Sequence, residues 1–325
     1  MKALWLENGD IKLRTDLAIP VAGPGEALIK VFYSGICSTD TGLMSGLYDF
    51  CGIPGHEFVG RVETGPSNLI GKRVAGEINI ACGECHSCLN VGKKHCSERK
   101  VLGIREHPGA FAEYVILPVE NLHIIPENLA SSVATFIEPL AAAFDIIEKI
   151  DINPETRTVV IGDGKLGQLI ARVIKTKTDN LVVLGKYPEK LSRLPDDIDY
   201  TDQTEELDPQ YFDVVIECTG NASGFDSALR LIKPGGKLVL KSTYPTPLSI
   251  DATIFVVNEI QIVGSRCGPF PRAIEYLKNE SNAKDIETLI DKEFTLSEGV
   301  SAFEHLKHCR RQNKQQLKIL LDITG

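Results

Sequence analysis

Short apolar runs that alternate with polar positions dominate roughly the first 130 residues. Examples are "EALIKVFYSG", "FVGRVETG", "KRVAGEI" and "AFAEYVILP", which are separated by glycine- and proline-containing turns. Alternation with a period of two is typical of strands with one buried face, and glycine and proline mark the turns between them. Few stretches keep the period of a helix. The pattern therefore predicts a β-rich half, built as an irregular barrel or sandwich with long loops.

The pattern changes near residue 131. The stretch "SSVATFIEPLAAAFDIIEKI" has serine in position to cap a helix and apolar residues at helical spacing. From Thr156 onward, apolar runs such as "RTVVIG", "NLVVLG", "FDVVIECTG", "GKLVLKS" and "IQIVGS" alternate with helical stretches such as "GKLGQLIARVIKTK". Continuous apolar strands that alternate with helices are typical of a parallel sheet covered on both faces. We therefore predict an α/β fold with a Rossmann-type, doubly wound parallel sheet.

The C-terminal stretch, from about residue 267, has a helical pattern until "QQLKILLDIT", which has the pattern of a strand. That strand has no place in the predicted parallel sheet, so we expect it to return to the first domain. A chain of 325 residues is longer than one small core requires. We predict one domain formed by residues 1–132 and 267–325, and a second formed by residues 133–266.

Composition narrows the partners and the compartment. The net charge of −9 disfavours nucleic acid and anionic membrane surfaces as partners. The N-terminal stretch "MKALWLENGDIKLR" lacks the apolar core of a signal peptide, and no run of about 18 uncharged apolar residues occurs. We expect a cytoplasmic protein that binds neither nucleic acid nor membrane. Its nine cysteines are then not expected to form disulfides.

A glycine-rich turn follows the first strand of the predicted parallel sheet. "VVIGDGKLGQL" contains the pattern Gly162-x-Gly164-x-x-Gly167 between a strand and a helix. The first glycine allows the tight turn, the second allows close approach of a pyrophosphate, and the third lets helix and strand pack closely. The free N–H groups of the helix favour the phosphates. We predict contacts to a dinucleotide from this turn and from strand ends, namely from Gly162, Gly164, Lys165, Leu166, Gly167, Thr219, Gly264 and Ser265.

The end of the second strand bears on which dinucleotide is bound. NAD-binding folds commonly place a carboxylate there, about 20 residues after the glycines, to bind the ribose 2′-hydroxyl. Here "LVVLGKYPEKL" has Gly185 and Lys186 at that place, and Lys190 follows. Gly185 leaves room for a 2′-phosphate, and either lysine could neutralise it, although both lysines could equally be solvated surface charges. We therefore expect NADP(H) to be favoured over NAD(H).

Four cysteines lie within one short loop. "CGECHSCLNVGKKHC" places Cys82, Cys85, Cys88 and Cys96 in the spacing C-x2-C-x2-C-x7-C. Two-residue gaps let neighbouring thiolates converge on one tetrahedral ion, and the longer arm supplies the fourth ligand. An iron–sulfur cluster is the alternative, although such clusters use other spacings. Because a four-thiolate site has no place for substrate, the loop 82–96 is predicted to hold a structural zinc ion.

A second group of candidate ligands is more dispersed. "GICSTD" contains Cys37, Thr39 and Asp40, and His56 follows in "PGHEFVG". With "FIEPLAAAFD", "VVIECTG", "LIKPGGKLVL" and the motifs above, in this order, the chain resembles a zinc-containing member of the medium-chain dehydrogenase/reductase superfamily over nearly its full length. The resemblance implies a β-rich, GroES-like catalytic domain beside the Rossmann domain. It is closer to the sorbitol, threonine and glucose dehydrogenases than to liver-type alcohol dehydrogenases, because Glu138 stands where the liver type has a cysteine ligand.

The resemblance also implies roles for single residues. Cys37 and His56 match two ligands of a catalytic zinc ion, and the third is either Glu57 or Glu138. Asp40 matches the carboxylate that orients the histidine, and Thr39 matches the hydroxyl that passes on the alcohol proton. Gly42 departs from the pattern, because many relatives have a histidine there that completes the proton relay. The family also suggests a homodimer or homotetramer.

These features together predict a zinc-dependent oxidoreductase with two zinc ions per chain, one catalytic and one structural. It would transfer hydride between a nicotinamide cofactor and an alcohol or polyol, or the matching carbonyl compound. One alternative is a reductase of activated double bonds, such as enones or quinones, that lacks catalytic zinc. Another is a non-catalytic nucleotide-binding protein of the same fold, which Gly42 favours. The substrate and the physiological direction are not encoded in any motif.

Overall fold

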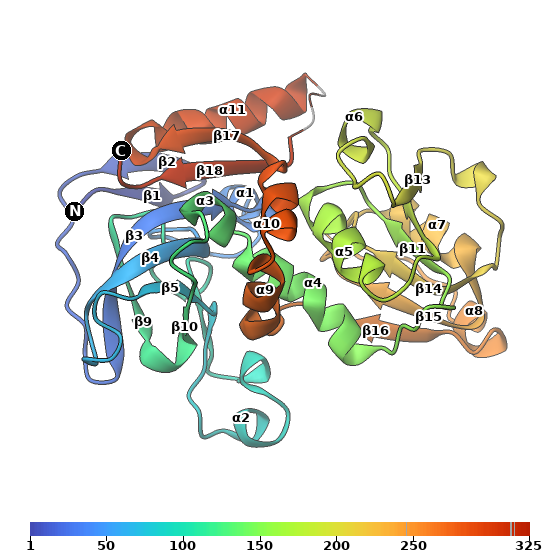
Figure 1. Ribbon diagram of the computed structural model, residues 1–325, viewed down its shortest axis with the longest axis horizontal. Helices are drawn as coiled ribbons and strands as arrows, with labels where there is room; N and C mark the ends of the chain where they lie inside the picture. The colour runs from blue at the N-terminus through green and yellow to red at the C-terminus, as the bar shows by residue number, and fades with distance from the viewer. Residues whose placement is uncertain (245, 313, 315) are drawn as a thin grey trace. The chain divides into compact units, whose positions relative to one another are not determined.

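The computed structural model describes residues 1–244, 246–312, 314 and 316–325, and the chain divides into two compact units (Figure 1). The first unit comprises Met1–Glu138, Phe270–Lys314 and Lys318–Gly325, and the second comprises Pro139–Pro269 with a short stretch just before Lys318. The boundaries predicted from the sequence were residues 133 and 267. Each unit is described below by itself.

A mainly antiparallel sheet forms the centre of the first unit. Its strands follow the order β10-β5-β4-β3-β18-β17, and β9 also pairs with β3. The C-terminal strand β18 pairs antiparallel with β3, which confirms the expected return to the first domain. The bounds are β3 Glu26–Ile36, β4 Glu57–Thr64, β5 Arg73–Gly76, β9 Tyr114–Pro118, β10 Leu122–Ile124, β17 Ile290–Thr295 and β18 Lys318–Asp322. Strand β17 lies in a stretch whose pattern had predicted only helix.

Smaller elements surround this sheet. They are the hairpin β1 Ala3–Glu7 and β2 Asp10–Arg14, the small sheet β6 Asn79–Ile80, β7 Lys100–Leu102 and β8 Glu106–His107, the helices α1 Ser38–Met44, α2 His86–Asn90, α9 Phe270–Leu277, α10 Glu280–Glu287 and α11 Gly299–Arg311, and the 3-10 turns Lys93–His95, Val119–Asn121 and Leu296–Glu298. No helix in the described part of the chain has both the length and the apolar composition that crossing a membrane requires.

The helix predicted from residue 131 onward is interrupted. The structure has a short helix, α3 Ser131–Ala134, and then α4 Ile137–Lys149. Pro139 explains the interruption, because its nitrogen cannot donate to the carbonyl of Thr135 and its ring would clash with that carbonyl in a continuous helix. The predicted serine cap is also wrong, because the N-cap of α3 is Ala130.

A six-stranded parallel sheet forms the second unit and confirms the predicted Rossmann-type fold. Its order is β13-β12-β11-β14-β15-β16, which is the 3-2-1-4-5-6 order of dinucleotide-binding sheets. The strands are β11 Thr158–Ile161, β12 Leu181–Leu184, β13 Asp199–Thr201, β14 Phe212–Glu217, β15 Ile232–Leu240 and β16 Gln261–Gly264, and the helices are α5 Lys165–Lys175, α6 Pro188–Leu191, α7 Ala222–Leu231 and α8 Thr253–Val257. The short strand β13 was not predicted.

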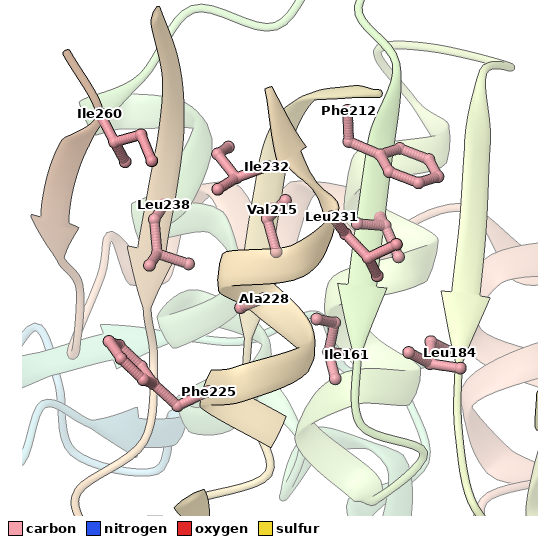
Figure 2. Close-up of a cluster of buried hydrophobic side chains, with 11 residues drawn as sticks. Ile161, Leu184, Phe212, Val215, Phe225, Ala228, Leu231, Ile232, Leu238 and Ile260 are labelled. Atoms are coloured by element: carbon pink, nitrogen blue, oxygen red, sulfur yellow. The ribbon is translucent and has the colours of Figure 1, made fainter. Parts of the chain in front are cut away.

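Helix α7 packs on this sheet through one apolar face (Figure 2). Phe225, Ala228 and Leu231 recur every three residues along the helix and are all buried. They meet strand residues such as Val215 and Ile161, which are also buried. Spacing of three to four residues places side chains on one helix face. This burial holds the strands in register, so that their carboxyl ends form the edge where the glycine-rich turn lies.

Candidate functional site

Three candidate ligands of the catalytic zinc come together where β3 ends and β4 begins. Gly35 of β3 pairs with Glu57, the first residue of β4. Cys37 follows β3 directly, and His56 directly precedes β4, so the antiparallel ladder brings them side by side. The ligand atoms of Cys37, His56 and Glu57 all lie within 4.8 Å of one another. The sequence separation between Cys37 and His56 is closed by strand pairing, as a shared cation requires.

Asp40 orients this cluster from helix α1. One of its carboxylate oxygens accepts a hydrogen bond from the backbone N–H of Cys37 at 2.7 Å. The other, Oδ1, lies 3.3 Å from Nδ1 of His56, and both side chains are buried. Burial lowers the pKa of His56, but the Asp40 carboxylate and the Cys37 sulfur more than offset this effect and raise that pKa well above its usual value. The histidine therefore faces a carboxylate on one side and the cysteine sulfur near it, as expected for a metal-ligating imidazole.

A buried ion pair holds Glu57. The Lys318 ammonium contacts Oε2 of Glu57, and both side chains are buried almost completely. The ammonium also lies 5.2 Å from the ring centre of Phe136. A Cβ on Gly35 would overlap the ends of the Lys318 and Glu57 side chains, so a larger residue at this point of β3 would require the ion pair to move. Sequence reasoning missed Lys318, although a lone lysine inside the apolar run "LKILL" was a signal for a buried charge.

Two other predicted residues differ in how they relate to this cluster. Oγ1 of Thr39 lies 3.7 Å from Sγ of Cys37, within reach of the same site. Glu138 lies in the first turn of α4, and its carboxylate does not join the group of close ligand atoms found among the described residues. At Gly42, a Cβ would lie 3.0 Å from Cδ2 of Leu47, so a larger residue there would require Leu47 to move.

The four cysteines of the loop converge as predicted. Their sulfur atoms all lie within 4.8 Å of one another. The distances are 3.5 Å for Cys85–Cys88 and Cys82–Cys96, 3.8 Å for Cys85–Cys96 and 3.9 Å for Cys82–Cys88. A tetrahedral ion with metal–sulfur bonds of ~2.3 Å requires sulfur–sulfur distances of ~3.8 Å. The loop therefore has the donor set and the spacing of a closed zinc site.

The protonation of these cysteines is already uneven. Hydrogen bonding with the backbone and the side chain of Cys88 lowers the pKa of Cys85 to about 6. Desolvation and the neighbouring Cys85 raise the pKa of Cys88 to about 12. The thiol of Cys85 therefore ionises more readily than that of Cys88, and binding of a cation would release the proton that Cys88 retains.

The glycine-rich turn has the geometry predicted for it. Gly162 has a φ of 129°, in the region that favours glycine. A Cβ on Gly167 would overlap the Gly162 carbonyl oxygen, and one on Gly164 would meet no atom within 4 Å. Helix α5 begins directly after Gly164, with Lys165 and Leu166 in its first turn, and no side chain caps it among the described residues. A helix N-terminus without a side-chain cap is a favourable place for a phosphate.

The end of β12 differs from the prediction in one respect. The space beside Gly185 is not empty, because a Cβ there would lie 2.8 Å from Cβ of Asp163. Nζ of Lys190 lies 3.8 Å from the Asp163 carboxylate, and Nζ of Lys186 lies 5.3 Å from the centre of the Tyr187 ring. Sequence reasoning missed Asp163, although an acid between the first two glycines of the fingerprint was visible.

The remaining predicted cofactor contacts already have partners in the protein. The backbone N–H of Thr219 donates to the Glu217 carboxylate at 2.6 Å. The hydroxyl of Ser265 accepts from Nζ of Lys241 at 2.9 Å and donates to Asp145 at 2.8 Å. The Gly264 carbonyl accepts from Lys149 at 2.6 Å. These residues lie at strand ends, as predicted, but a cofactor would have to share or displace these bonds at Thr219, Gly264 and Ser265.

Comparison with protein families now adds to this geometry. Residues 23–127 match the family model of the alcohol dehydrogenase GroES-like domain. Residues 192–280 match the model of the zinc-binding dehydrogenase domain. A sorbitol dehydrogenase of Halalkalibacterium halodurans is 31% identical over 327 residues, which covers 93% of each chain. The chain belongs to the zinc-containing medium-chain dehydrogenase/reductase family. As a member of this family, it is an oxidoreductase.

Another relative and two solved structures are similar over a comparable share of the chain. An erythritol/L-threitol dehydrogenase of Mycolicibacterium smegmatis is 30% identical over 319 residues, or 87% of this chain and 88% of that one. A structure described as a zinc-binding dehydrogenase of Sinorhizobium meliloti 1021, bound to NADP, has a TM-score of 0.85 and 26% identity over 99% and 98% of the two chains. An alcohol dehydrogenase structure from E. coli CFT073, with NADH, shares the fold with a TM-score of 0.88, 24% identity and 99% coverage of both chains.

Proposed function

We propose that this medium-chain dehydrogenase uses a catalytic zinc ion to interconvert an alcohol or polyol and the matching carbonyl compound. The observation that carries the proposal is the cluster of Cys37, His56 and Glu57, whose ligand atoms lie within 4.8 Å of one another. A thiolate, an imidazole and a carboxylate suit zinc, and three protein ligands leave one position open for a substrate oxygen. When bound, zinc acts as a Lewis acid on that oxygen, and the nicotinamide exchanges the hydride.

Residues around the open position of the zinc ion have separate roles. The Asp40 carboxylate lies beside Nδ1 of His56. This leaves Nε2 of His56 to bind the zinc ion. Thr39, beside the Cys37 sulfur, is placed to take the substrate proton. Because Gly42 supplies no second relay group, the proton leaves Thr39 through water or the cofactor ribose. The two alternatives, a zinc-independent reductase and a non-catalytic nucleotide-binding protein, do not need Cys37, His56 and Asp40 in this arrangement.

The third protein ligand is Glu57 or Glu138. Glu57 lies in the cluster, but Lys318 already balances its charge, which weakens it as a donor to a cation. Glu138 lies in the first turn of α4, outside the group of close ligand atoms formed by Cys37, His56 and Glu57. Zinc content of Glu57→Gln and Glu138→Gln variants separates the two. The variant that removes the ligand loses one zinc ion, while the other retains it and changes only turnover.

The proposal also includes a structural zinc ion, a homo-oligomer and a nicotinamide dinucleotide as cofactor. The sulfur–sulfur distances of the loop 82–96 support a structural zinc ion. A homodimer or homotetramer remains a prediction from the family, and light scattering measures it. The glycine-rich turn supports a nicotinamide dinucleotide. Lys186 and the missing acid at residue 185 support NADP(H), whereas the carboxylate of Asp163 beside Gly185 opposes it.

A substrate panel tests the proposal directly. Alcohols and polyols, including sorbitol and erythritol because similar enzymes are named for them, are assayed with NAD and NADP by the absorbance of the reduced nicotinamide. We expect turnover of at least one polyol or secondary alcohol, and its loss in Cys37→Ala while cofactor binding persists. Full turnover in Cys37→Ala would contradict zinc catalysis and favour a zinc-independent reductase.

A further inference from the structure

Strand β12 ends without a side chain of its own, and another loop fills the place. Leu184 is the last residue of β12, and Gly185 follows. A Cβ on Gly185 would lie 2.8 Å from Cβ of Asp163 and 2.6 Å from Cδ2 of Leu191. A larger side chain at residue 185 would therefore collide with both. Asp163, from the glycine-rich turn, occupies the space that a strand-end acid fills in folds that have one.

Two backbone groups fix the carboxylate of Asp163 in this place. The N–H groups of Lys186 and Tyr187 both donate to its Oδ2, each at 2.7 Å. Nζ of Lys190 lies 3.8 Å from Oδ1, and the Asp163 side chain is 9% exposed. A carboxylate has about four acceptor sites, so Oδ1 retains capacity for a hydroxyl donor. The carboxylate is thus held at the carboxyl edge of the sheet with one oxygen still able to accept.

We propose that Asp163 selects the cofactor by accepting a hydrogen bond from a ribose 2′-hydroxyl and by disfavouring a 2′-phosphate. This inference rests on the proposed function, because it needs a dinucleotide at the glycine-rich turn. The N–H groups of Lys186 and Tyr187, which could otherwise bind a phosphate, already donate to Asp163. The charge of Lys190 is already balanced by the same carboxylate.

The charge of Asp163 adds a direct effect. A carboxylate a few ångströms from a phosphate repels it, because both groups carry negative charge. Gly185 and the two lysines had favoured NADP(H) in the sequence, because the glycine was taken to leave space and the lysines to neutralise a phosphate. In the structure, Asp163 fills the space beside Gly185, and its carboxylate is paired with Lys190. We therefore expect NAD(H), and not NADP(H), to be favoured.

Binding of cofactor fragments to the full-length protein tests this without turnover. Isothermal titration calorimetry measures the dissociation constants of ADP-ribose and of its 2′-phosphorylated form. We expect the wild-type protein to bind ADP-ribose more tightly, and Asp163→Asn, which keeps the shape and removes the charge, to shift the ratio of the two constants about tenfold toward the phosphorylated form. Asp208→Asn removes the same charge near the amino end of β14 and serves as the matched control, with an unchanged ratio.

The ratio distinguishes selection from a merely structural role. If Asp163 only tied the turn to the strand, Asp163→Asn would weaken both fragments equally, and this result would overturn the proposal. A second variant guards against misfolding of the first: Lys190→Gln removes the charge that balances Asp163 and should shift the ratio further toward ADP-ribose. Wild-type protein that binds both fragments equally would overturn the inference alone. Protein that binds neither would contradict the proposed function as well.

Discussion

The two cysteine-containing clusters of the first unit are built in opposite ways. The four cysteines of the loop 82–96 are neighbours in the sequence, and helix α2 within this loop has no buried residue. Cys37, His56 and Glu57 come from the ends of two paired strands, and His56 and Glu57 are 3% and 1% exposed. In the loop, the four cysteine sulfurs lie close together without a buried apolar helix face to support them. In the buried cluster, the sheet brings the ligands together before any ion binds.

This difference predicts different consequences of metal loss. A loop with little apolar surface of its own depends on the ion for its structure. The buried cluster is supported by Asp40, by Lys318 and by the pairing of β3 with β4, so its fold should survive without the ion while its chemistry should not. The variants below test this contrast.

Replacement of Cys37 should have the largest effect. Cys37→Ala removes the thiolate of the proposed catalytic zinc, and we expect turnover to fall by about a thousandfold or more, because Lewis-acid stabilisation contributes several kcal/mol. The melting temperature should change little, because Cys37 lies outside both strands. Steady-state kinetics and thermal unfolding of the same sample measure both. A large loss of stability would show that the buried cluster depends on its ion as the loop does.

Removal of Lys318 should mainly affect stability. Lys318→Met leaves the buried Glu57 carboxylate without its partner, and we expect the free energy of unfolding to fall by about 3–5 kcal/mol. Denaturant unfolding of zinc-free protein measures it. The double variant Lys318→Met with Glu57→Gln removes both charges and should recover most of that loss. If the single and double variants are equally stable, the ion pair does not hold the cluster.

Removal of a loop cysteine should act locally. In Cys96→Ser, we expect cleavage by added protease within residues 82–96 to become about tenfold faster or more, because the loop opens without its ion. Turnover should decrease much less than in Cys37→Ala. Mass spectrometry of the fragments locates the cleavage. Unchanged cleavage would mean that the loop holds its shape without a metal.

Removal of a partly exposed ion pair in the second unit, between Asp213 and Arg157, should have the smallest effect on stability. It serves as a reference for the buried pair of Lys318 and Glu57. Hydrogen bonds from Arg157, together with Lys233, hold the pKa of Asp213 well below its usual range. Because folding lowers this pKa, the stabilisation is complete above pH ~4 and is lost as the pH falls further. Asp213→Asn should reduce the free energy of unfolding by about 1 kcal/mol at pH 7. The difference between the variant and the wild type should shrink below pH ~4, and a constant difference would contradict this account.

The sequence predicted the parts of the molecule whose signals are local. The glycines 162, 164 and 167 and the four cysteines occupy short segments whose spacing determines the geometry. The apolar runs of the second unit predicted five of its strands, because buried parallel strands are continuously apolar. Strand β13, with two exposed residues in three, lacked this signal.

The rest depends on contacts between distant segments. Lys318 and Glu57 are 261 residues apart and meet only because β18 and β4 both pair with β3. Asp163 fills the space beside Gly185, which the sequence shows only as a missing side chain. The family resemblance supplied Cys37 and His56, but neither residue was diagnostic alone. Neither the periodicity nor the motif spacing of a sequence predicts contacts between residues that lie so far apart in it.

The zinc content of three proteins tests whether Cys37, His56 and Glu57 hold a zinc ion in addition to the one in the loop 82–96. Elemental analysis of purified wild-type protein, Cys37→Ala and Cys96→Ser measures zinc ions per chain. We expect two in the wild type and one in each variant, with turnover lost in Cys37→Ala alone. One zinc ion in the wild type, unchanged in Cys37→Ala, would show that the cluster of Cys37, His56 and Glu57 holds no metal and would contradict the proposed chemistry.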